Sequence, residues 1–189
     1  KTSLEIWLAM AYAAGVAPWD GAPPLGPGRV LIYSLDEAPE QIARRMNGLA
    51  IFHPAGPIER YDERLVVIGP DRETDPALLD ALRFDEDGLQ VLSTWLGEAE
   101  QAGDPFIAVF VDAYADVLPL GETENSNEEA TRIGGALERL AVRHGCAIGL
   151  LHHCGKPKAD AGEDLPDIRF LGRGASALAG KARTLFSLE

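Results

Sequence analysis

Four short runs of this chain are apolar at nearly every position rather than at every second one. A strand with alternating polar and apolar residues exposes one face to water, whereas a continuously apolar strand is buried on both faces. The four runs cover residues 29–35, 65–69, 106–112 and 147–152. Helical segments separate them, and this order is typical of a parallel sheet covered on two sides. We therefore predict an α/β fold with a mostly parallel sheet and helices on both faces.

The expected helices are recognised by their periodicity and by their end signals. Residues 4–14 are apolar on nearly all sides, and Gly15 follows them as a helix stop. Pro39 suits the first turn of a helix over residues 39–46, which residues 47–48 would close. Further helices are expected over residues 76–82, over 88–102, from a capping box at 126–129 to Gly145, and over 174–180, with a last strand over 183–188.

Length and composition limit the class of protein. A chain of 189 residues with 46% apolar and 25% charged side chains supports a single domain, which we expect to span residues 1–189. No apolar run approaches the length of a membrane-spanning helix, and we expect no membrane association. Two cysteines cannot form a disulfide framework, and no signal peptide is recognised, which favours the cytoplasm. The net charge of −13 argues against a protein that coats nucleic acid.

Lys1 and Thr2 directly precede the first apolar helix. A Lys-Thr pair in this place matches the end of the phosphate-binding loop G-x-x-x-x-G-K-[ST], and we expect the glycines of that loop upstream. An ordinary surface N-terminus would show the same two residues. The pair therefore supports a phosphate-binding loop only if other residues of such a site are found later in the chain.

Acidic residues follow two of the predicted strands. Ligands of parallel sheets bind where the strands end. Asp112 ends the third run and is a candidate Mg²⁺ ligand, directly or through water, although an acid also simply ends strands. Asp36 and Glu37 follow the first run. One of them is a candidate base for the water that attacks a γ-phosphate, and the alternative is that both cap the next helix.

His152 and His153 end the fourth run. Adjacent strand residues point to opposite faces, so the two histidines chelate one metal ion poorly. We interpret them as a polar sensor that hydrogen-bonds phosphate and reports its hydrolysis. The alternative is one histidine in the core and one on the surface.

Charge is unevenly distributed along the chain. Residues 59–100 contain twelve acids and four arginines, a net charge of −8, whereas residues 152–189 contain six basic and five acidic residues, a net charge of +1. The long polar stretch 156–173 is therefore a candidate contact for single-stranded DNA, or else a solvated loop. Lys181 and Arg183 share one face of the last predicted strand, where they are either surface cations or groups presented to a neighbouring subunit's nucleotide.

The order of these pieces resembles that of a known family. The segments that carry the resemblance are Lys1–Thr2, residues 28–40, residues 109–112, residues 150–156 and residues 173–178. Together they are similar to RecA-like P-loop ATPases related to the hexameric replicative helicase RepA and to KaiC, over essentially the whole chain. The resemblance implies a RecA-like P-loop NTPase fold, ATP and Mg²⁺ as ligands, and a hexameric ring of identical subunits.

The same resemblance assigns roles to individual residues. Lys1 would be the phosphate-loop lysine, Thr2 the Mg²⁺ hydroxyl and Asp112 the Walker B acid. His153 would be the sensor, with His152 beside it. Lys181 and Arg183 would act in trans across the ring interface, and residues 156–173 would face the central channel.

Two departures from the family pattern affect these expectations. The family reads Leu-Glu-Asp-Pro after the second strand, whereas this chain has Leu35, Asp36, Glu37 and Ala38. The usual base position therefore carries Asp36, which is one methylene shorter, and Glu37 is the alternative base. The glycine loop and the strand before it are absent from the sequence, and that strand would lie in the middle of the sheet.

The resemblance and the residues together predict Mg²⁺-dependent ATP hydrolysis that drives translocation on single-stranded DNA in plasmid or phage replication. Three alternatives stay open at this point. The first is a RecA-like regulatory or loader ATPase without helicase activity. The second is a phosphotransferase acting on a small molecule, although the acidic segment 59–100 suits a second phosphate poorly. The third is a pseudo-ATPase that binds nucleotide without turnover.

Overall fold

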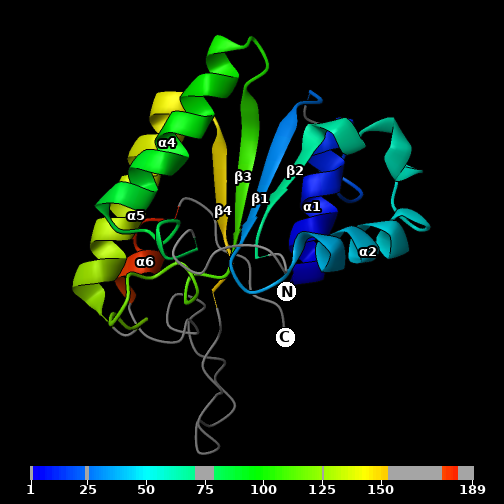
Figure 1. The fold of residues 1–189 in the computed structure, drawn as a ribbon. Coiled ribbons are helices and arrows are strands. Elements are labelled where there is room, and N and C mark those ends of the chain that lie inside the picture. The colour runs from blue at the N-terminus through cyan, green and yellow to red at the C-terminus, as the bar shows by residue number, and fades with distance from the viewer. Residues whose placement is uncertain (1, 24–25, 71–78, 125, 153–175, 183–189) are drawn as a thin grey trace, which may run out of the picture.

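The sheet has four strands, all parallel, in the order β2-β1-β3-β4. The computed structural model describes residues 2–23, 26–70, 79–124, 126–152 and 176–182 (Figure 1). The strands are β1 (Arg29–Ser34), β2 (Leu65–Ile68), β3 (Phe106–Asp112) and β4 (Ala147–Leu150). The predicted α/β fold with a parallel sheet is confirmed, and all four strands fall within the predicted runs.

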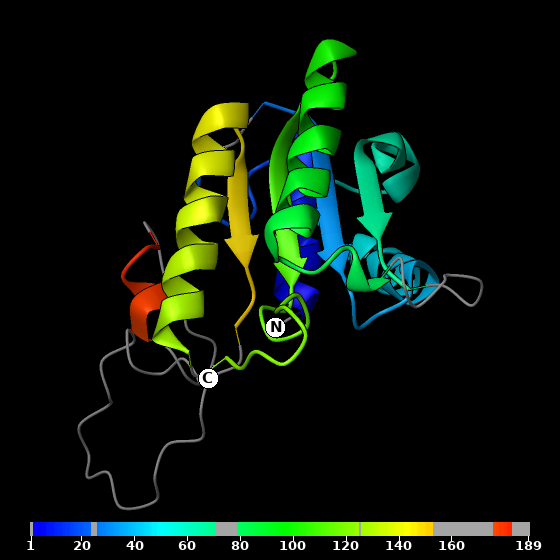
Figure 2. The ribbon, with the colours of Figure 1, turned by 60° about the vertical axis from the view of Figure 1, so that its left-hand side comes forward.

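Helices cover both faces of this sheet, as predicted. On one face lie α1 (Thr2–Ala14) and α2 (Pro39–Ala50), and on the other lie α4 (Glu86–Gln101) and α5 (Asn127–His144) (Figures 1 and 2). The short helix α6 (Ser176–Ala179) packs on α5. Two 3₁₀ turns, η1 (Ile58–Arg60) and η2 (Asp62–Arg64), lead into β2. Of the helix expected over residues 76–82, residues 76–78 lie outside the described residues, and the described part is helical only at 79–80 and then turns. The strand expected over 183–188 lies wholly outside the described residues.

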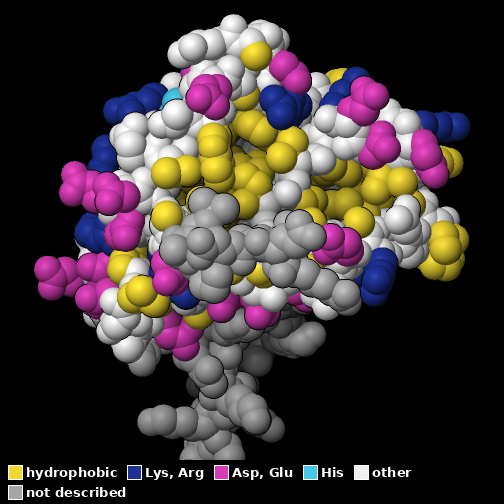
Figure 3. Space-filling model, viewed as in Figure 1, with side chains coloured by type: hydrophobic (Ala, Val, Ile, Leu, Met, Phe, Trp, Pro, Cys, Tyr) yellow, Lys and Arg dark blue, Asp and Glu magenta, His cyan; other side chains and the backbone are white. Residues whose placement is uncertain are grey.

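The inner strand β1 divides its side chains between two cores. Val30 and Ile32 pack with α1 and α2, whereas Leu31 and Tyr33 pack with α4 and α5. Each is at most 1% exposed. Burying an aliphatic side chain of this size contributes about 1.5–3 kcal/mol, so both layers depend on this one strand. The edge strand β2 is only half-buried, and apolar side chains are visible between the two helical layers in Figure 3.

The helix α2 is longer than its sequence predicts. The sequence predicts an end at residues 47–48, but the helix continues through Gly48 to Ala50. Leu49 and Ala50 pack against the core beneath α1, and this contact favours another helical turn. The apolar contact outweighs a glycine in the helix interior, which costs about 1 kcal/mol relative to alanine.

The ends of α5 follow the predicted signals. The Ser126 hydroxyl accepts a hydrogen bond from the Glu129 N–H at 3.2 Å, as an N-cap does. Gly145 closes the helix with φ at +61°, a left-handed conformation that glycine adopts without strain. Near this end the His144 ring bonds Ser93 and Glu100 of α4, at 3.2 and 2.8 Å, and so joins the two helices. None of the helices in the described ranges is both long and apolar enough to cross a lipid bilayer.

The buried His53 fastens the segment after α2 to the first helix. Its Nε2–H donates to the Trp7 carbonyl at 2.9 Å, and its Nδ1 accepts from the Ala55 N–H at 3.1 Å. The two rings of His53 and Trp7 meet edge to face, with centroids 4.3 Å apart. Burial lowers the pKa of His53, so the neutral ring that this pattern needs is the favoured form.

The chain connections create a crevice at one end of the sheet. The connection from β1 leads outward to β2, whereas the connection from β3 leads to β4 on the other side. The ends of β1 and β3 therefore lie at a topological switch point, which is where open α/β sheets bind ligands.

Candidate functional site

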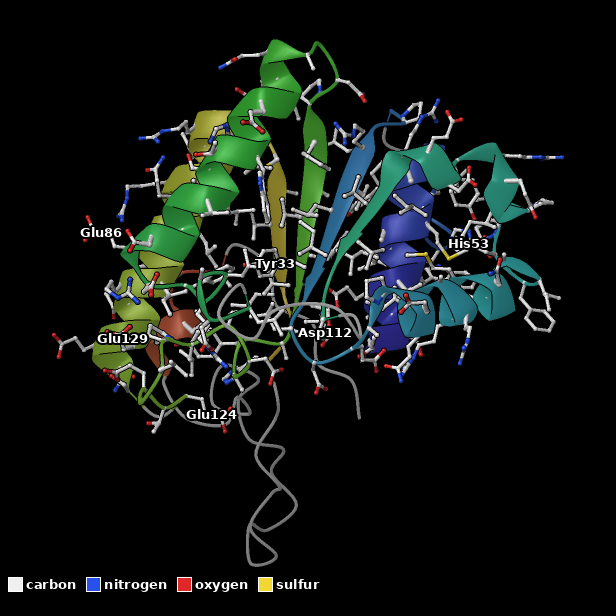
Figure 4. The ribbon with its side chains drawn as sticks, in the orientation of Figure 1. Tyr33, His53, Glu86, Asp112, Glu124 and Glu129 are labelled. Carbon is white, nitrogen blue, oxygen red and sulfur yellow. The ribbon has the colours of Figure 1, made fainter. Side chains whose placement is uncertain are left out.

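The first turn of α1 meets the carboxyl end of β3 at this edge of the sheet. The Thr2 hydroxyl donates a hydrogen bond to Oδ2 of Asp112 at 2.7 Å, across 110 positions of sequence. Figure 4 shows Asp112 at the strand ends, beside the start of α1. The structure thus brings together two residues that the sequence singled out independently. Their roles as Mg²⁺ ligands stay predictions.

Asp112 lies in surroundings that disfavour its negative charge. Burial raises its pKa above the ordinary value, the Thr2 hydrogen bond lowers it, and the neighbouring carboxylates of Asp116 and Asp36 raise it again. Three acids therefore share one small region, and the Asp112 carboxylate forms no ion pair with another described residue. A bound cation would relieve both the burial cost and the repulsion.

The donor set fits Mg²⁺ that is bound together with phosphate. Among the residues that the structure describes, no group of three or more Asp, Glu, His or Cys side chains is placed to hold a metal ion. Mg²⁺ is commonly bound by only one or two carboxylates, with substrate phosphates and water completing its shell. A hydroxyl and a carboxylate joined at 2.7 Å supply hard oxygen ligands of this kind.

The two acids after β1 have different surroundings. Glu37 is half-buried and forms an ion pair with Arg45 of α2, and its backbone N–H donates to the Ser34 hydroxyl at 3.2 Å. Asp36 is exposed and forms no hydrogen bond or ion pair with another described residue. It lies close enough to Asp112 to raise the pKa of that carboxyl. Asp36 therefore lies within electrostatic reach of Asp112, whereas Glu37 is paired with α2.

Glu5 is an acid of the site that the sequence interpretation missed. It lies one turn after Thr2 in α1, is 2% exposed, and neither of its carboxyl oxygens has a hydrogen-bond partner among the described residues. Burial first, and the charge of Asp112 second, raise its pKa to about 9. The available signal was an acid inside an otherwise apolar helix, directly after the Lys-Thr pair.

Glu5 should make the stability of the protein fall as pH rises. Because its folded-state pKa of about 9 exceeds the ordinary 4.5, the folded state holds a proton that the unfolded state releases between these values. Between about pH 5 and pH 8, we expect the unfolding free energy of Glu5→Gln to rise relative to that of the parent by about 4 kcal/mol. Urea unfolding at both pH values measures this, with Glu98→Gln on the exposed face of α4 as control. Parallel pH profiles for parent and Glu5→Gln would contradict the assignment.

An open hollow of about 410 Å³ lies at the switch point. Leu35 follows β1, and Ala115 and Asp116 follow β3, so residues just beyond the ends of these two strands line the hollow. On the far side, Arg83 donates to the carbonyls of Asp116 and Leu118 at 2.8 and 3.1 Å, which fixes the segment after β3. The hollow lies beside the candidate site and not in it, because Thr2, Asp36 and Asp112 are not among its lining residues.

His152 lies just beyond β4, on the face of the sheet that α4 and α5 cover. Its ring meets Tyr114 edge to face, with centroids 5.3 Å apart, and its Nε2 is 3.8 Å from the Glu124 carboxylate. Tyr114 is also joined to the residue after β4 by a backbone hydrogen bond, from the Tyr114 N–H to the Leu151 carbonyl at 2.8 Å. His153, the predicted sensor, lies outside the described residues.

The remaining predicted site residues lie away from Asp112 or outside the described ranges. Lys181 is exposed and lies on the outer surface of α5, beside Gly134. It is not among the residues that surround Asp112. Lys1, Arg183 and the stretch 156–173 lie outside the described residues, so the contacts predicted for them stay predictions.

Comparison with known proteins identifies a family for this chain. Residues 1–159 match the family described as the AAA domain. The match covers most of the 189 residues, and it includes both Thr2 and Asp112. No curated protein matches the chain.

Proposed function

Because the chain belongs to the AAA domain family, we propose that it binds ATP with Mg²⁺ at the carboxyl edge of its sheet and hydrolyses it. Family and fold together make this a P-loop ATPase-like domain. The single observation that carries the proposal is the 2.7 Å hydrogen bond from the Thr2 hydroxyl to Asp112. It joins the end of a predicted phosphate loop to the acid at the tip of a buried strand, which is the oxygen pair that holds Mg²⁺ in such sites.

Each residue has a defined task in this proposal. Thr2 and Asp112 would hold Mg²⁺, which would neutralise charge on the phosphate oxygens when it is bound. Lys1 contributes a positive charge next to the same phosphates, in the role that the Lys-Thr motif predicts. The parallel strands and α1 fix Thr2 and Asp112 before the nucleotide arrives, so these two groups need little reorganisation during the reaction.

Asp36 is the proposed general base. Its carboxylate has no described partner, whereas that of Glu37 is held by Arg45. In the proposed step Asp36 accepts a proton from water as the water oxygen bonds to the γ-phosphorus. The bond from that phosphorus to the bridging oxygen breaks, and ADP leaves with the electron pair. A base placed in this way contributes about 10²–10⁴-fold to a rate.

We further propose that this turnover serves movement on single-stranded DNA within a homo-oligomer. The resemblance to RepA-type ATPases supports this use, and so does the less acidic C-terminal part of the sequence, with a net charge of +1 over residues 152–189. A regulatory or loader ATPase is the main alternative, since it needs the same nucleotide site and no DNA. A nucleotide-binding pseudo-ATPase is the second alternative, because Asp36 is a shorter acid than the family's glutamate.

Stimulation by DNA distinguishes these uses. We expect the full-length protein to hydrolyse ATP with Mg²⁺, faster with single-stranded DNA than without it, and we expect Lys1→Ala to abolish both rates. Steady-state phosphate release measures them. Turnover indifferent to DNA would support the regulator, and bound nucleotide without turnover would support the pseudo-ATPase.

A further inference from the structure

A second hollow, of about 370 Å³, lies on the outer surface of α5 and is rich in positive charge. Three cations line it, Arg139 and Arg143 from α5 and Lys181 from the segment after α6. None of the three forms an ion pair or hydrogen bond with another described residue. Figure 3 shows Lys and Arg side chains interspersed with Asp and Glu along the left-hand edge of the molecule. In a chain of net charge −13, such a cluster needs an explanation.

Two consecutive glycines in the middle of α5 lie against two of these cations, and Gly135 also lines the hollow. A methyl group on Gly134 would lie 3.3 Å from Cγ of Lys181, and one on Gly135 would lie 3.4 Å from the guanidinium of Arg139. The missing side chains therefore let both cations lie close against the helix. Each glycine in a helix interior costs about 1 kcal/mol relative to alanine, so the cationic hollow is obtained at the expense of helix stability.

The cations are arranged to follow a repeating anion. Arg139 and Arg143 are four residues apart, so they lie about 5–6 Å from each other along one helix face. Glu138 is the single acid that lines the hollow, against three cations. A groove of unpaired cations that tracks a phosphate backbone is how proteins bind single strands without reading their sequence.

We propose that this cationic hollow, formed by Arg139, Arg143 and Lys181, binds the phosphate backbone of single-stranded DNA. The hollow is separate from the stretch 156–173, which the sequence singled out, but α6 follows that stretch directly and leads to Lys181. The proposal rests on the single-stranded DNA part of the proposed function. It adds a defined contact on the described surface of the protein.

The test is direct binding of fluorescent oligo-dT to the full-length protein over a range of salt concentrations. Three phosphate contacts predict a slope of log affinity against log salt of about −2, or an affinity loss of about twentyfold between about 50 and 200 mM salt. Arg139→Gln with Arg143→Gln should weaken binding about tenfold and make the slope shallower by about 1.4. Arg44→Gln with Arg60→Gln, two exposed arginines without a described partner, is the matched control.

The outcomes separate this proposal from the proposed function. Equal DNA binding by the two double variants would overturn the proposed role of the hollow and would leave the DNA-linked function unaffected. No binding of oligo-dT by the parent would overturn both, whereas DNA-independent ATP turnover on the same samples would keep the nucleotide site. If the Arg139→Gln Arg143→Gln variant lost self-association in sedimentation but bound DNA like the parent, the hollow would be a contact with a second copy of the chain. That result would also overturn the proposal.

Discussion

Replacing Asp112 by asparagine is expected to lower ATP turnover about a thousandfold while leaving the unliganded fold at least as stable. The substitution keeps the shape of the side chain and an oxygen that can accept the hydrogen bond of Thr2. It removes the negative charge that would hold Mg²⁺. Because a metal ion contributes several kcal/mol to charge neutralisation in phosphoryl transfer, the loss should fall mainly on kcat.

The stability side of this prediction follows from the surroundings of Asp112. Burial and the acids Asp116 and Asp36 raise its pKa, so its ionised form destabilises the empty fold at neutral pH. Asparagine carries no such charge and should not lower the unfolding temperature. Mg²⁺ with nucleotide should raise that temperature for the parent, because a ligand that binds only the folded state stabilises it, and should fail to do so for Asp112→Asn.

Steady-state turnover and thermal unfolding with and without Mg²⁺ and nucleotide measure both effects. Asp104→Asn is the matched control. Asp104 is an exposed aspartate in the loop before β3, where it forms an ion pair with Arg29 away from the site. Full activity in Asp112→Asn would remove Asp112 from the metal site. Equal loss in both variants would point to a general effect on the fold.

The sequence predicted the fold correctly where a segment is apolar on both faces, because such a segment fits only a buried strand. Residues 106–112 are apolar up to Asp112, and β3 has these bounds. The end of α2 could not be read in this way, because Gly48 is a local stop signal and the contact of Leu49 with the core is a tertiary one. Local signals decide an element when no packing contact competes with them, as at Ser126 and Gly145 of α5.

The candidate site was predictable in part for a related reason. Asp112 and Thr2 stand at the ends of elements, and parallel topology brings such ends together. Glu5 was missed because it stands inside a helix, where only the three-dimensional packing shows that it points inward. Lys181 was expected to share the face of a strand, whereas the structure places it beside Gly134 of α5, a contact that no spacing in the sequence reveals.

Asp36 and Glu37 offer the second large effect, because the sequence left both as candidate bases and the structure separates them. Glu37 is paired with Arg45, and its backbone N–H is bonded to Ser34. Arg45 contacts only Oε1 of Glu37, and Oε2 is buried without a hydrogen-bond partner among the described residues, so the ion pair fixes this carboxylate toward α2. Asp36 has no such described contact and lies near Asp112.

We therefore expect Asp36→Asn to lower ATP turnover by about 10²–10⁴-fold with nucleotide affinity nearly unchanged, because a base acts on the transition state and not on binding. Glu37→Gln should keep turnover within severalfold of the parent and lower stability by at most about 1 kcal/mol, the usual value of a partly exposed ion pair. Single-turnover kinetics, a fluorescent-nucleotide titration and urea unfolding measure the three quantities. The reverse result, with turnover lost in Glu37→Gln and kept in Asp36→Asn, would show that Glu37 leaves Arg45 and acts as the base. Slow turnover in both variants and in the parent alike would mean that neither acid activates water, and the chain would then be a nucleotide-binding module.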